Sequence, residues 1–268
     1  MSSFRRISDV SCQWPSRPVG LIELIGGSYI SIKPEVTYKR LISCLLKRNF
    51  AVHSWGYIPN FDHQLQANQA WKQFRQSRKI LEKRVGLIPK SIRLGHSLGC
   101  KLHLLAPDGG RNCDGLVAIS FNNFRADKSI PLLRKMSKKL NFQTEFSPSP
   151  SETLNLVREH YEQINNLLIK FKNDNLDQND FLLKSLKERS ADKSKIMNLD
   201  GNHLTPVSVG LREKLLKANL QNSLKYENIN FLIYLKLIYL QEYLYPHLFR
   251  RPKQVLLKFC ALFCHFLF

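Results

Sequence analysis

The sequence predicts an α/β fold with a mostly parallel sheet and helices on both faces. From Pro18 onward, short β-rich runs alternate with longer runs that repeat apolar residues every three or four positions, and this alternation is typical of β-α units. The chain has 268 residues, of which 43% are hydrophobic. It is therefore long enough to bury the core of one such domain and to add an appendage.

The first two β-α units are predicted from apolar runs and helical periodicity. Val19–Ile25 is a mainly apolar run that ends at Gly26-Gly27, and Phe50–Trp55 is a second β-rich run. Each is followed by a predicted helix, one over Glu35–Arg48 and one from about Asp62 to Arg84, because apolar side chains recur on one face. These side chains are Tyr38, Leu41, Ile42, Leu45 and Leu46 in the first helix, and Ala67, Trp71, Phe74, Leu81 and Val85 in the second.

The later units are shorter and include one long connection. The predicted strands are Ser91–Leu94, Gly115–Ser120, Leu167–Phe171 and Lys195–Leu199, and the predicted helices are Cys100–Ala106, one opened by Ser151, one near Asp180–Arg189 and one from about Pro206. The segment from Asn122 to Pro150 has little periodicity and exceeds an ordinary connection in length. We therefore expect a short lid insertion after the fourth predicted strand. Its apolar side chains would be Phe121, Phe124, Leu132, Leu133, Met136 and Phe142.

These elements divide the chain into three segments. Residues 1–17 form an N-terminal extension, residues 18–223 form the α/β domain with its lid at about 122–150, and residues 224–268 form an apolar and basic helical appendage. The longest stretch of the appendage without a strongly charged residue, Phe259–Phe268, would measure about 15 Å as a helix. A bilayer core is about 30 Å thick. We expect the appendage to dock on the core or to form a homodimer, with an anionic membrane surface as the alternative.

The segment Gly95-His96-Ser97-Leu98-Gly99 matches the pattern G-x-S-x-G. In this pattern the serine lies on a strained turn between a strand and a helix, and the glycines avoid steric clashes in the turn. The predicted strand before it and helix after it are the context that the motif requires. Ser97 is therefore a candidate nucleophile, and the alternative is a glycine-rich turn with an unreactive serine.

Candidates for an acid and a base follow Ser97 in the order Ser, Asp, His that α/β-hydrolases use. Asp174 lies just past the strand Leu167–Phe171, and His203 lies in the turn past the last predicted strand. Both positions fall at the carboxyl edge of a parallel sheet, where Ser97 also lies. Asp177 shares the loop of Asp174 and is the alternative acid, or it caps the following helix. The alternative for His203 is a structural histidine in a loop, whereas His96 is expected to pack or to tune the pocket.

Backbone N–H groups near Ser97 are candidates for an oxyanion hole. One is the N–H of Leu98, at the start of the helix after the turn. Others belong to Gly27 and Ser28, in the loop after the first predicted strand, where glycine permits close approach of the backbone. The sequence contains no GxGxxG, no P-loop and no metal-ligand spacing, so neither a cofactor nor a metal is expected.

Several stretches together resemble an uncharacterised α/β-hydrolase-like family of cyanobacteria and plant plastids, domain-of-unknown-function family 1350. They are GLIELIGGSYISIKPEVTYKRL, GHSLGCKLHLL, LVAISFNNF, EFSPSPSETLNL, LLIKFKNDNLDQ and GNHLTP, and they cover about residues 19–207. The resemblance implies Ser97 as nucleophile, Asp174 or Asp177 as acid and His203 as base. It does not supply a substrate.

The charge is unusual, with 41 Lys and Arg against 21 Asp and Glu and a net charge of +20. Residues 1–150 contribute +15 and residues 211–268 contribute +6, whereas residues 151–210 contribute −1. Such a chain is attracted to polyanions. Because no recognition module for nucleic acid is visible, nucleic-acid binding is not expected, and peripheral association with an anionic membrane is the expected use of the charge.

The cysteines and the N-terminus bear on the compartment. The six cysteines form no CxxC pair and no zinc-type cluster, which favours reduced thiols in the cytoplasm. The first residues lack the apolar core of a signal peptide, and their Arg and Ser content with a lone Asp9 leaves a transit peptide open, with a plastid location if the chain comes from a plant.

The functional hypothesis is a serine hydrolase of the esterase, lipase or thioesterase type, acting on a small acyl or lipid-like substrate through an acyl-enzyme. The alternative is a catalytically silent hydrolase-like scaffold that binds a membrane surface or a protein partner.

Overall fold

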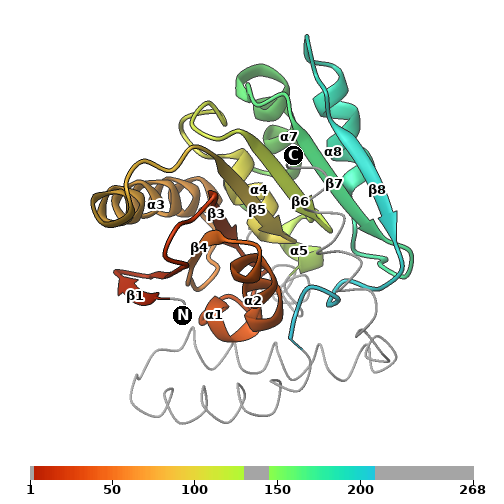
Figure 1. Ribbon diagram of the computed structural model, residues 1–268. Helices are drawn as coiled ribbons and strands as arrows, with labels where there is room; N and C mark the ends of the chain where they lie inside the picture. The colour runs from red at the N-terminus through yellow and green to blue at the C-terminus, as the bar shows by residue number, and fades with distance from the viewer. Residues whose placement is uncertain (1–2, 130–144, 209–268) are drawn as a thin grey trace.

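Eight strands form a single sheet in the order β1-β2-β4-β3-β5-β6-β7-β8 in the computed structural model, which describes residues 3–129 and 145–208 (Figure 1). β1 and β2 form an antiparallel hairpin, β2 is antiparallel to β4, and all the later neighbours are parallel. The predicted α/β fold class is therefore confirmed. The strands are β1 (Ser3–Ile7), β2 (Val10–Trp14), β3 (Gly20–Ile25), β4 (Phe50–Trp55), β5 (Ser91–His96), β6 (Gly115–Ile119), β7 (Asn166–Phe171) and β8 (Lys195–Leu199).

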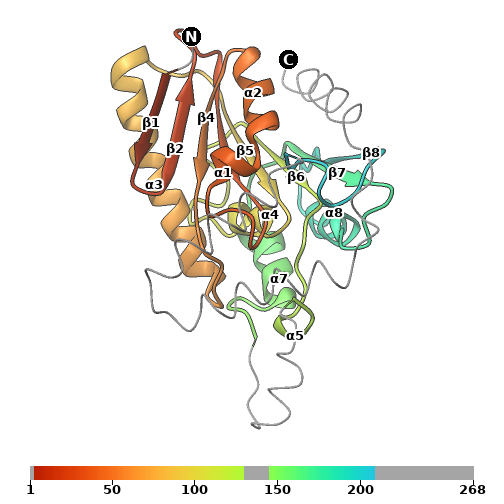
Figure 2. The ribbon, with the colours of Figure 1, turned by 90° about the horizontal axis from the view of Figure 1, so that it is seen from below.

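Helices cover both faces of the sheet, as Figures 1 and 2 show for α2 and α3 on opposite sides. One face packs with α1 and α2 around side chains such as Ile22 and Leu94. The other face packs with α3, α4, α7 and α8 around side chains such as Leu21 and Leu168. Alternate residues of the central strands therefore point into two separate cores. The helices are α1 (Pro34–Thr37), α2 (Lys39–Lys47), α3 (His63–Val85), α4 (Leu98–Leu104), α5 (Ala126–Ser129), α7 (Pro150–His160) and α8 (Asn179–Lys187).

The N-terminal residues are part of the sheet, which corrects their interpretation as an extension over residues 1–17. Val10, Cys12 and Trp14 alternate along β2 and are buried against the core that α3 covers. Apolar and polar residues alternate over Val10–Trp14, a pattern that is typical of a half-buried strand and that the sequence analysis did not use. β1, at the sheet edge, contains two arginines and lacks this pattern.

Two other expectations are changed by tertiary packing. The helix expected over Glu35–Arg48 is divided at Tyr38 into α1 and α2. Phe121, expected in an apolar lid, is fully buried in the core beneath α7 and α8. The middle of the lid, most of the helix expected from about Pro206, and the appendage over 224–268 lie outside the described residues. None of the helices that the structure describes is long and apolar enough to cross a membrane.

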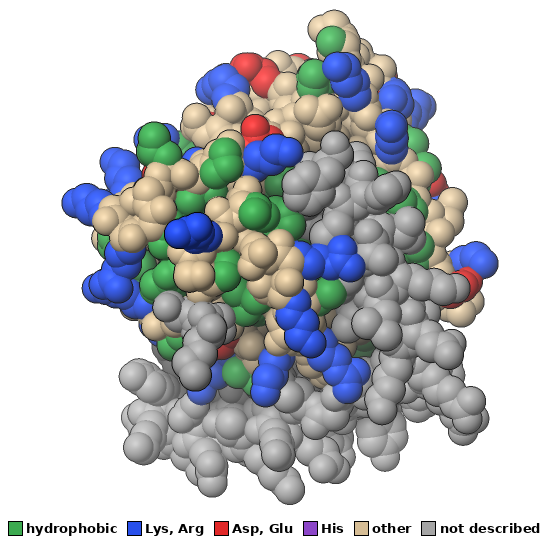
Figure 3. Space-filling view, in the orientation of Figure 1, with side chains coloured by type: hydrophobic (Ala, Val, Ile, Leu, Met, Phe, Trp, Pro, Cys, Tyr) green, Lys and Arg blue, Asp and Glu red, His purple; other side chains and the backbone are tan. Residues whose placement is uncertain are grey.

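The outer face of α3 is basic. Lys72, Arg75, Lys79 and Lys83 are exposed along it, and Lys and Arg side chains are spread over the face of the molecule in Figure 3. The inward face of the same helix buries Ala67, Phe74 and Leu81. The positive charge of α3 therefore lies on its solvent-exposed face, as is typical of an amphipathic helix.

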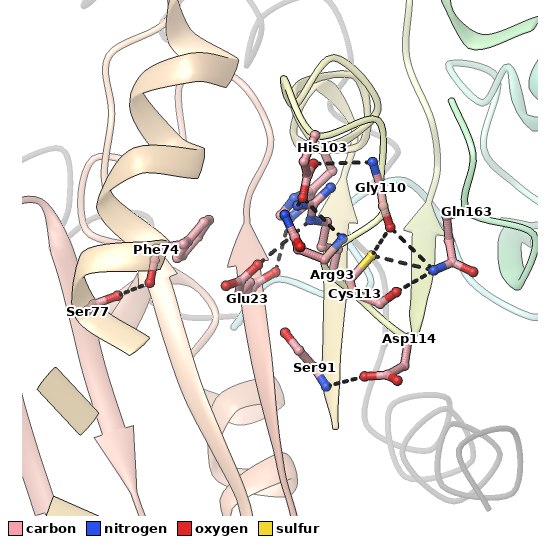
Figure 4. A network of polar contacts seen from close by, with 12 residues as sticks. Glu23, Phe74, Ser77, Ser91, Arg93, His103, Gly110, Cys113, Asp114 and Gln163 are labelled. Carbon is pink, nitrogen blue, oxygen red and sulfur yellow. Dashed lines mark hydrogen bonds and ion pairs between the residues drawn. The ribbon is translucent and has the colours of Figure 1, made fainter. Parts of the chain in front are cut away.

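A buried ionic network lies between the sheet and the helices α3 and α4 (Figure 4). Arg93 on β5 is 3% exposed, its Nη2 donates to Asp108 Oδ2 at 2.7 Å, and its Nε lies 3.8 Å from Glu23 Oε2 on β3. Burial alone would raise the pKa of Asp108, but the bond to Arg93 outweighs it and lowers that pKa to about 2. Arg93 thus compensates two buried carboxylates at once.

We expect Arg93→Met to lower the free energy of unfolding by about 3–5 kcal/mol, because two buried carboxylates would lose their counter-ion. Urea denaturation followed by circular dichroism measures the change. Arg111→Met is the matched control, since Arg111 pairs with Glu162 at the surface, and such a pair contributes about 0–1 kcal/mol. Equal effects of the two substitutions would contradict the expectation.

Candidate active site at the carboxyl edge of the sheet

Ser97 lies in the turn between β5 and α4. Its φ of 55° and ψ of −121° place a non-glycine residue in a backbone region that side chains rarely adopt. Its N–H donates to the carbonyl of Ile119 on β6 at 2.9 Å, so the neighbouring strand holds the turn in place. The side chain stands at the carboxyl edge of the sheet, as a nucleophile elbow requires.

The glycines of this turn are needed for steric reasons. A Cβ on Gly95 would lie 2.6 Å from the N of Cys100, and a Cβ on Gly99 would lie 2.0 Å from the carbonyl oxygen of Ile25. Both neighbours are backbone atoms, so a side chain at either glycine would force the backbone to shift. The glycines therefore let α4 begin directly above β3 and β5.

Asp174 follows β7 and is directed at His203. Its Oδ2 lies 2.9 Å from Nδ1 of His203, and its side chain is fully buried. Its Oδ1 accepts from the N–H of Leu176 at 2.9 Å. Burial alone would raise the pKa of Asp174, but the bond to His203 and the charge on that ring outweigh it and lower the pKa. Asp174 is therefore an ionised, oriented carboxylate.

Asp177, the alternative acid, has a different partner. Its two oxygens accept from the backbone N–H and the side-chain amide of Asn179, at 3.0 and 2.8 Å, at the start of α8. Burial, assisted by the charge of Asp174, raises its pKa to about 6. Of the two aspartates, only Asp174 is hydrogen-bonded to His203 in the described part of the chain.

His203 lies in the loop after β8, beside the residue that precedes Ser97. The Nε2 of His96 is 2.8 Å from the carbonyl oxygen of His203, and the two imidazole rings are 5.0 Å apart. The N–H of Asn173 donates to the carbonyl of Gly201 at 3.0 Å and joins this loop to the loop of Asp174. Within residues 3–129 and 145–208, no hydrogen bond joins the Ser97 hydroxyl to His203. Such bonds are often long in a protein without substrate.

Tyr38 is the residue of this site that the sequence analysis did not select. Its hydroxyl lies 2.8 Å from Nδ1 of His96 and accepts from the N–H of Gly27 at 2.8 Å. The periodicity of the segment predicted Tyr38 as a core side chain, and it is indeed fully buried. The sequence gives only a general indication of a role beyond packing, because the hydroxyl of a buried tyrosine needs a polar partner.

The three candidate oxyanion donors differ in availability. A Cβ on Gly27 would lie 3.1 Å from Cβ of Ser97, so this loop passes beside the serine, but the Gly27 N–H already donates to Tyr38. Leu98 is the first residue of α4, where a backbone N–H has no acceptor within the helix. Ser28 follows Gly27 in the same loop. Leu98 and Ser28 thus remain as the candidate donors of an oxyanion hole.

The polar groups at this edge, a hydroxyl, an imidazole and a carboxylate, are of the kinds that nucleophilic attack and proton transfer use. Among the residues that the structure describes, no group of three or more His, Cys, Asp or Glu side chains could hold a metal ion. The order of the site along the chain, serine after β5, aspartate after β7 and histidine after β8, is that of α/β-hydrolases.

The fold is that of the α/β-hydrolases. A monoacylglycerol lipase from Paleococcus ferrophilus is 15% identical, with a TM-score of 0.53, and the match covers 79% of this chain and 97% of the lipase. FphF, a fluorophosphonate-binding serine hydrolase of Staphylococcus aureus, is 17% identical, with a TM-score of 0.54 and coverage of 76% and 91%. An esterase from Pyrococcus furiosus is 14% identical, with a TM-score of 0.51 and coverage of 84% and 91%. At these identities the likeness concerns the fold.

Residues 3–219 match the family described as Protein of unknown function (DUF1350), and the chain belongs to that family. The match includes the N-terminal hairpin together with Ser97, Asp174 and His203. The resemblance to domain-of-unknown-function family 1350 is thereby confirmed. No curated protein sequence matches the chain.

Proposed function

We propose that the protein is a serine hydrolase that cleaves an ester or thioester through an acyl-enzyme on Ser97. The observation that supports this most directly is the bond of 2.9 Å between His203 Nδ1 and Asp174 Oδ2, in a loop bonded to the residue before Ser97. A carboxylate on Nδ1 holds the proton there and leaves Nε2 free to accept a proton from a hydroxyl. The backbone of Ser97, with φ of 55°, supports the same role.

In the proposed reaction, the Ser97 hydroxyl attacks the carbonyl carbon and its proton passes to Nε2 of His203. The negative charge that develops on the carbonyl oxygen accepts hydrogen bonds from the N–H groups of Leu98 and Ser28. His203 then returns the proton to the departing alcohol or thiol, and Asp174 stabilises the imidazolium in between. A water molecule, deprotonated by the same histidine, releases the acid and restores Ser97.

Apolar side chains beside the Gly26-Gly27 loop favour an acyl substrate. The hydroxyl of Tyr57 donates to the carbonyl of Gly26 at 3.0 Å, which places the segment after β4 against this loop. In that segment and the first turn of α3, Ile58, Phe61 and Leu65 are 57%, 40% and 47% exposed. Phe146 lies near the end of the predicted lid segment, and the centroid of its ring is 5.7 Å from that of Phe61. Exposed apolar side chains grouped in this way are typical of binding surfaces.

The test is covalent labelling of the purified protein with a fluorophosphonate, which phosphonylates serine nucleophiles activated by a base. We expect one label per chain, found by mass spectrometry of peptides on Ser97. Heat-denatured protein is the control, because labelling depends on the folded arrangement of Ser97 and His203. A folded protein that takes up no label, or takes it up at another serine, would contradict the proposal and favour the silent scaffold.

A further inference from the structure

We propose that Tyr38 and His96 are positioning residues, which hold the His203 loop in register with Ser97 and tie it to the Gly27 loop through a continuous chain of hydrogen bonds. The chain runs from the Gly27 N–H to the Tyr38 hydroxyl, from that hydroxyl to His96 Nδ1, and from His96 Nε2 to the His203 carbonyl, with 2.8 Å at every step. The inference rests on the proposed function, since positioning has meaning only if His203 is the base.

The donor at one end, the Gly27 N–H, and the acceptor at the other, the His203 carbonyl, determine where each proton lies. The carbonyl oxygen of His203 only accepts hydrogen bonds, so Nε2 of His96 must have the proton. In the neutral ring Nδ1 is then an acceptor, so the Tyr38 hydroxyl, which accepts from Gly27, donates its own proton to Nδ1. Burial lowers the pKa of His96 to about 3, which keeps the ring neutral. The opposite tautomer would set a lone pair against the carbonyl oxygen at 2.8 Å.

The local structure around Tyr38 is consistent with this role. The backbone is non-helical at Tyr38, with φ of −102° and ψ of 21°, and this interruption separates α1 from α2. Gly26 leaves room for the ring, because a Cβ there would lie 2.4 Å from Cε2 of Tyr38. The segment that follows His203 is also bonded next to Tyr38, since the N–H of Ser208 donates to the carbonyl of Thr37 at 2.8 Å.

Two other buried histidines of the described chain have internal partners. His53 bonds to Ser77 at 3.0 Å, and His103 bonds to the carbonyl of Glu23 at 3.0 Å. Ser77 belongs to α3 and Glu23 to β3, so neither partner is in the loop of His203. His53 is thus a matched control for the cost of removing a buried histidine, because its Nδ1 also meets a hydroxyl and burial also lowers its pKa to about 3.

The test compares fluorophosphonate labelling of Ser97 in His96→Leu, His96→Gln and Tyr38→Phe. Misplacement of a catalytic group by about 1 Å can cost about 10²-fold in rate. We expect His96→Leu to lower kinact by about that factor with little change in KI. Glutamine still offers an amide N–H to the His203 carbonyl, so it should recover about tenfold, the effect of one hydrogen bond. The kinact of Tyr38→Phe should lie between those of the wild type and His96→Leu.

The controls separate positioning from loss of folding. His53→Leu should lower the unfolding temperature as His96→Leu does, yet leave kinact at the wild-type value. A ¹⁵N–¹H correlation spectrum of the imidazole rings should show His96 protonated on Nε2 alone in the wild type, and this readout does not depend on activity.

Three results would overturn the proposal. They are labelling of His96→Leu at the wild-type rate, an equal fall in kinact for His53→Leu, and a His96 ring protonated on Nδ1. If the wild type is not labelled at all, the proposed function fails instead, and the two failures are therefore distinguishable.

Discussion

Ser97→Ala is expected to lower kcat for hydrolysis of 4-nitrophenyl octanoate by about 10⁶-fold, the size of effect that follows loss of a nucleophile in a serine triad. Alanine removes the oxygen that forms the acyl-enzyme, and no other hydroxyl replaces it at this turn. The rate is followed by release of 4-nitrophenolate. Octanoate is chosen because Ile58, Phe61 and Leu65 are exposed beside the loop of Gly26 and Gly27.

The substitution should leave the fold intact, since alanine keeps the Cβ that the turn already accommodates. Ser54→Ala is the matched control, because Ser54 is also buried and its hydroxyl donates to the carbonyl of Ser11 on the neighbouring strand, away from the candidate site. We expect this variant to keep the wild-type kcat. A Ser97→Ala protein that hydrolyses the ester at a rate within tenfold of wild type would exclude the acyl-enzyme mechanism.

Asp174→Asn is expected to lower kcat by about 10⁴-fold, with a native circular dichroism spectrum. Asparagine would donate from its amide to Nδ1 of His203 and would accept the tautomer with the proton on Nε2. That nitrogen then faces Ser97 with a proton already in place and cannot act as a base. Hydrolysis of the same ester measures the effect.

Asp177→Asn separates the two candidate acids. Asp177 accepts from Asn179 and has no bond to His203 in residues 3–129 and 145–208, and its pKa of about 6 already leaves it partly neutral near pH 6. We expect kcat to stay close to the wild-type value. The reverse result, loss of activity in Asp177→Asn and its retention in Asp174→Asn, would reassign the acid.

Much of the fold could be predicted because its signals are local. The limits of β4 and β8 agree with the predicted limits, and α3 differs by a single residue at each end. These elements show clear apolar runs or helical periodicity, which depend on neighbours in the chain. The hairpin β1-β2 was not predicted. β1 is an edge strand with two arginines and lacks such a pattern, and it pairs with β2, which in turn pairs with β4.

The candidate site divides in the same way. The sequence alone determined that a serine between two glycines follows a strand and precedes a helix, and that an aspartate and a histidine follow later strands, because residue type and order along the chain are enough for that. It could not choose between Asp174 and Asp177, which are three positions apart in one loop. Only the tertiary structure decided which carboxylate meets His203, that Tyr38 occupies the Gly27 N–H, and that His96 holds the His203 loop. The physical reason is that each of these contacts joins atoms more than ten residues apart, whose approach depends on how the sheet brings its loops together.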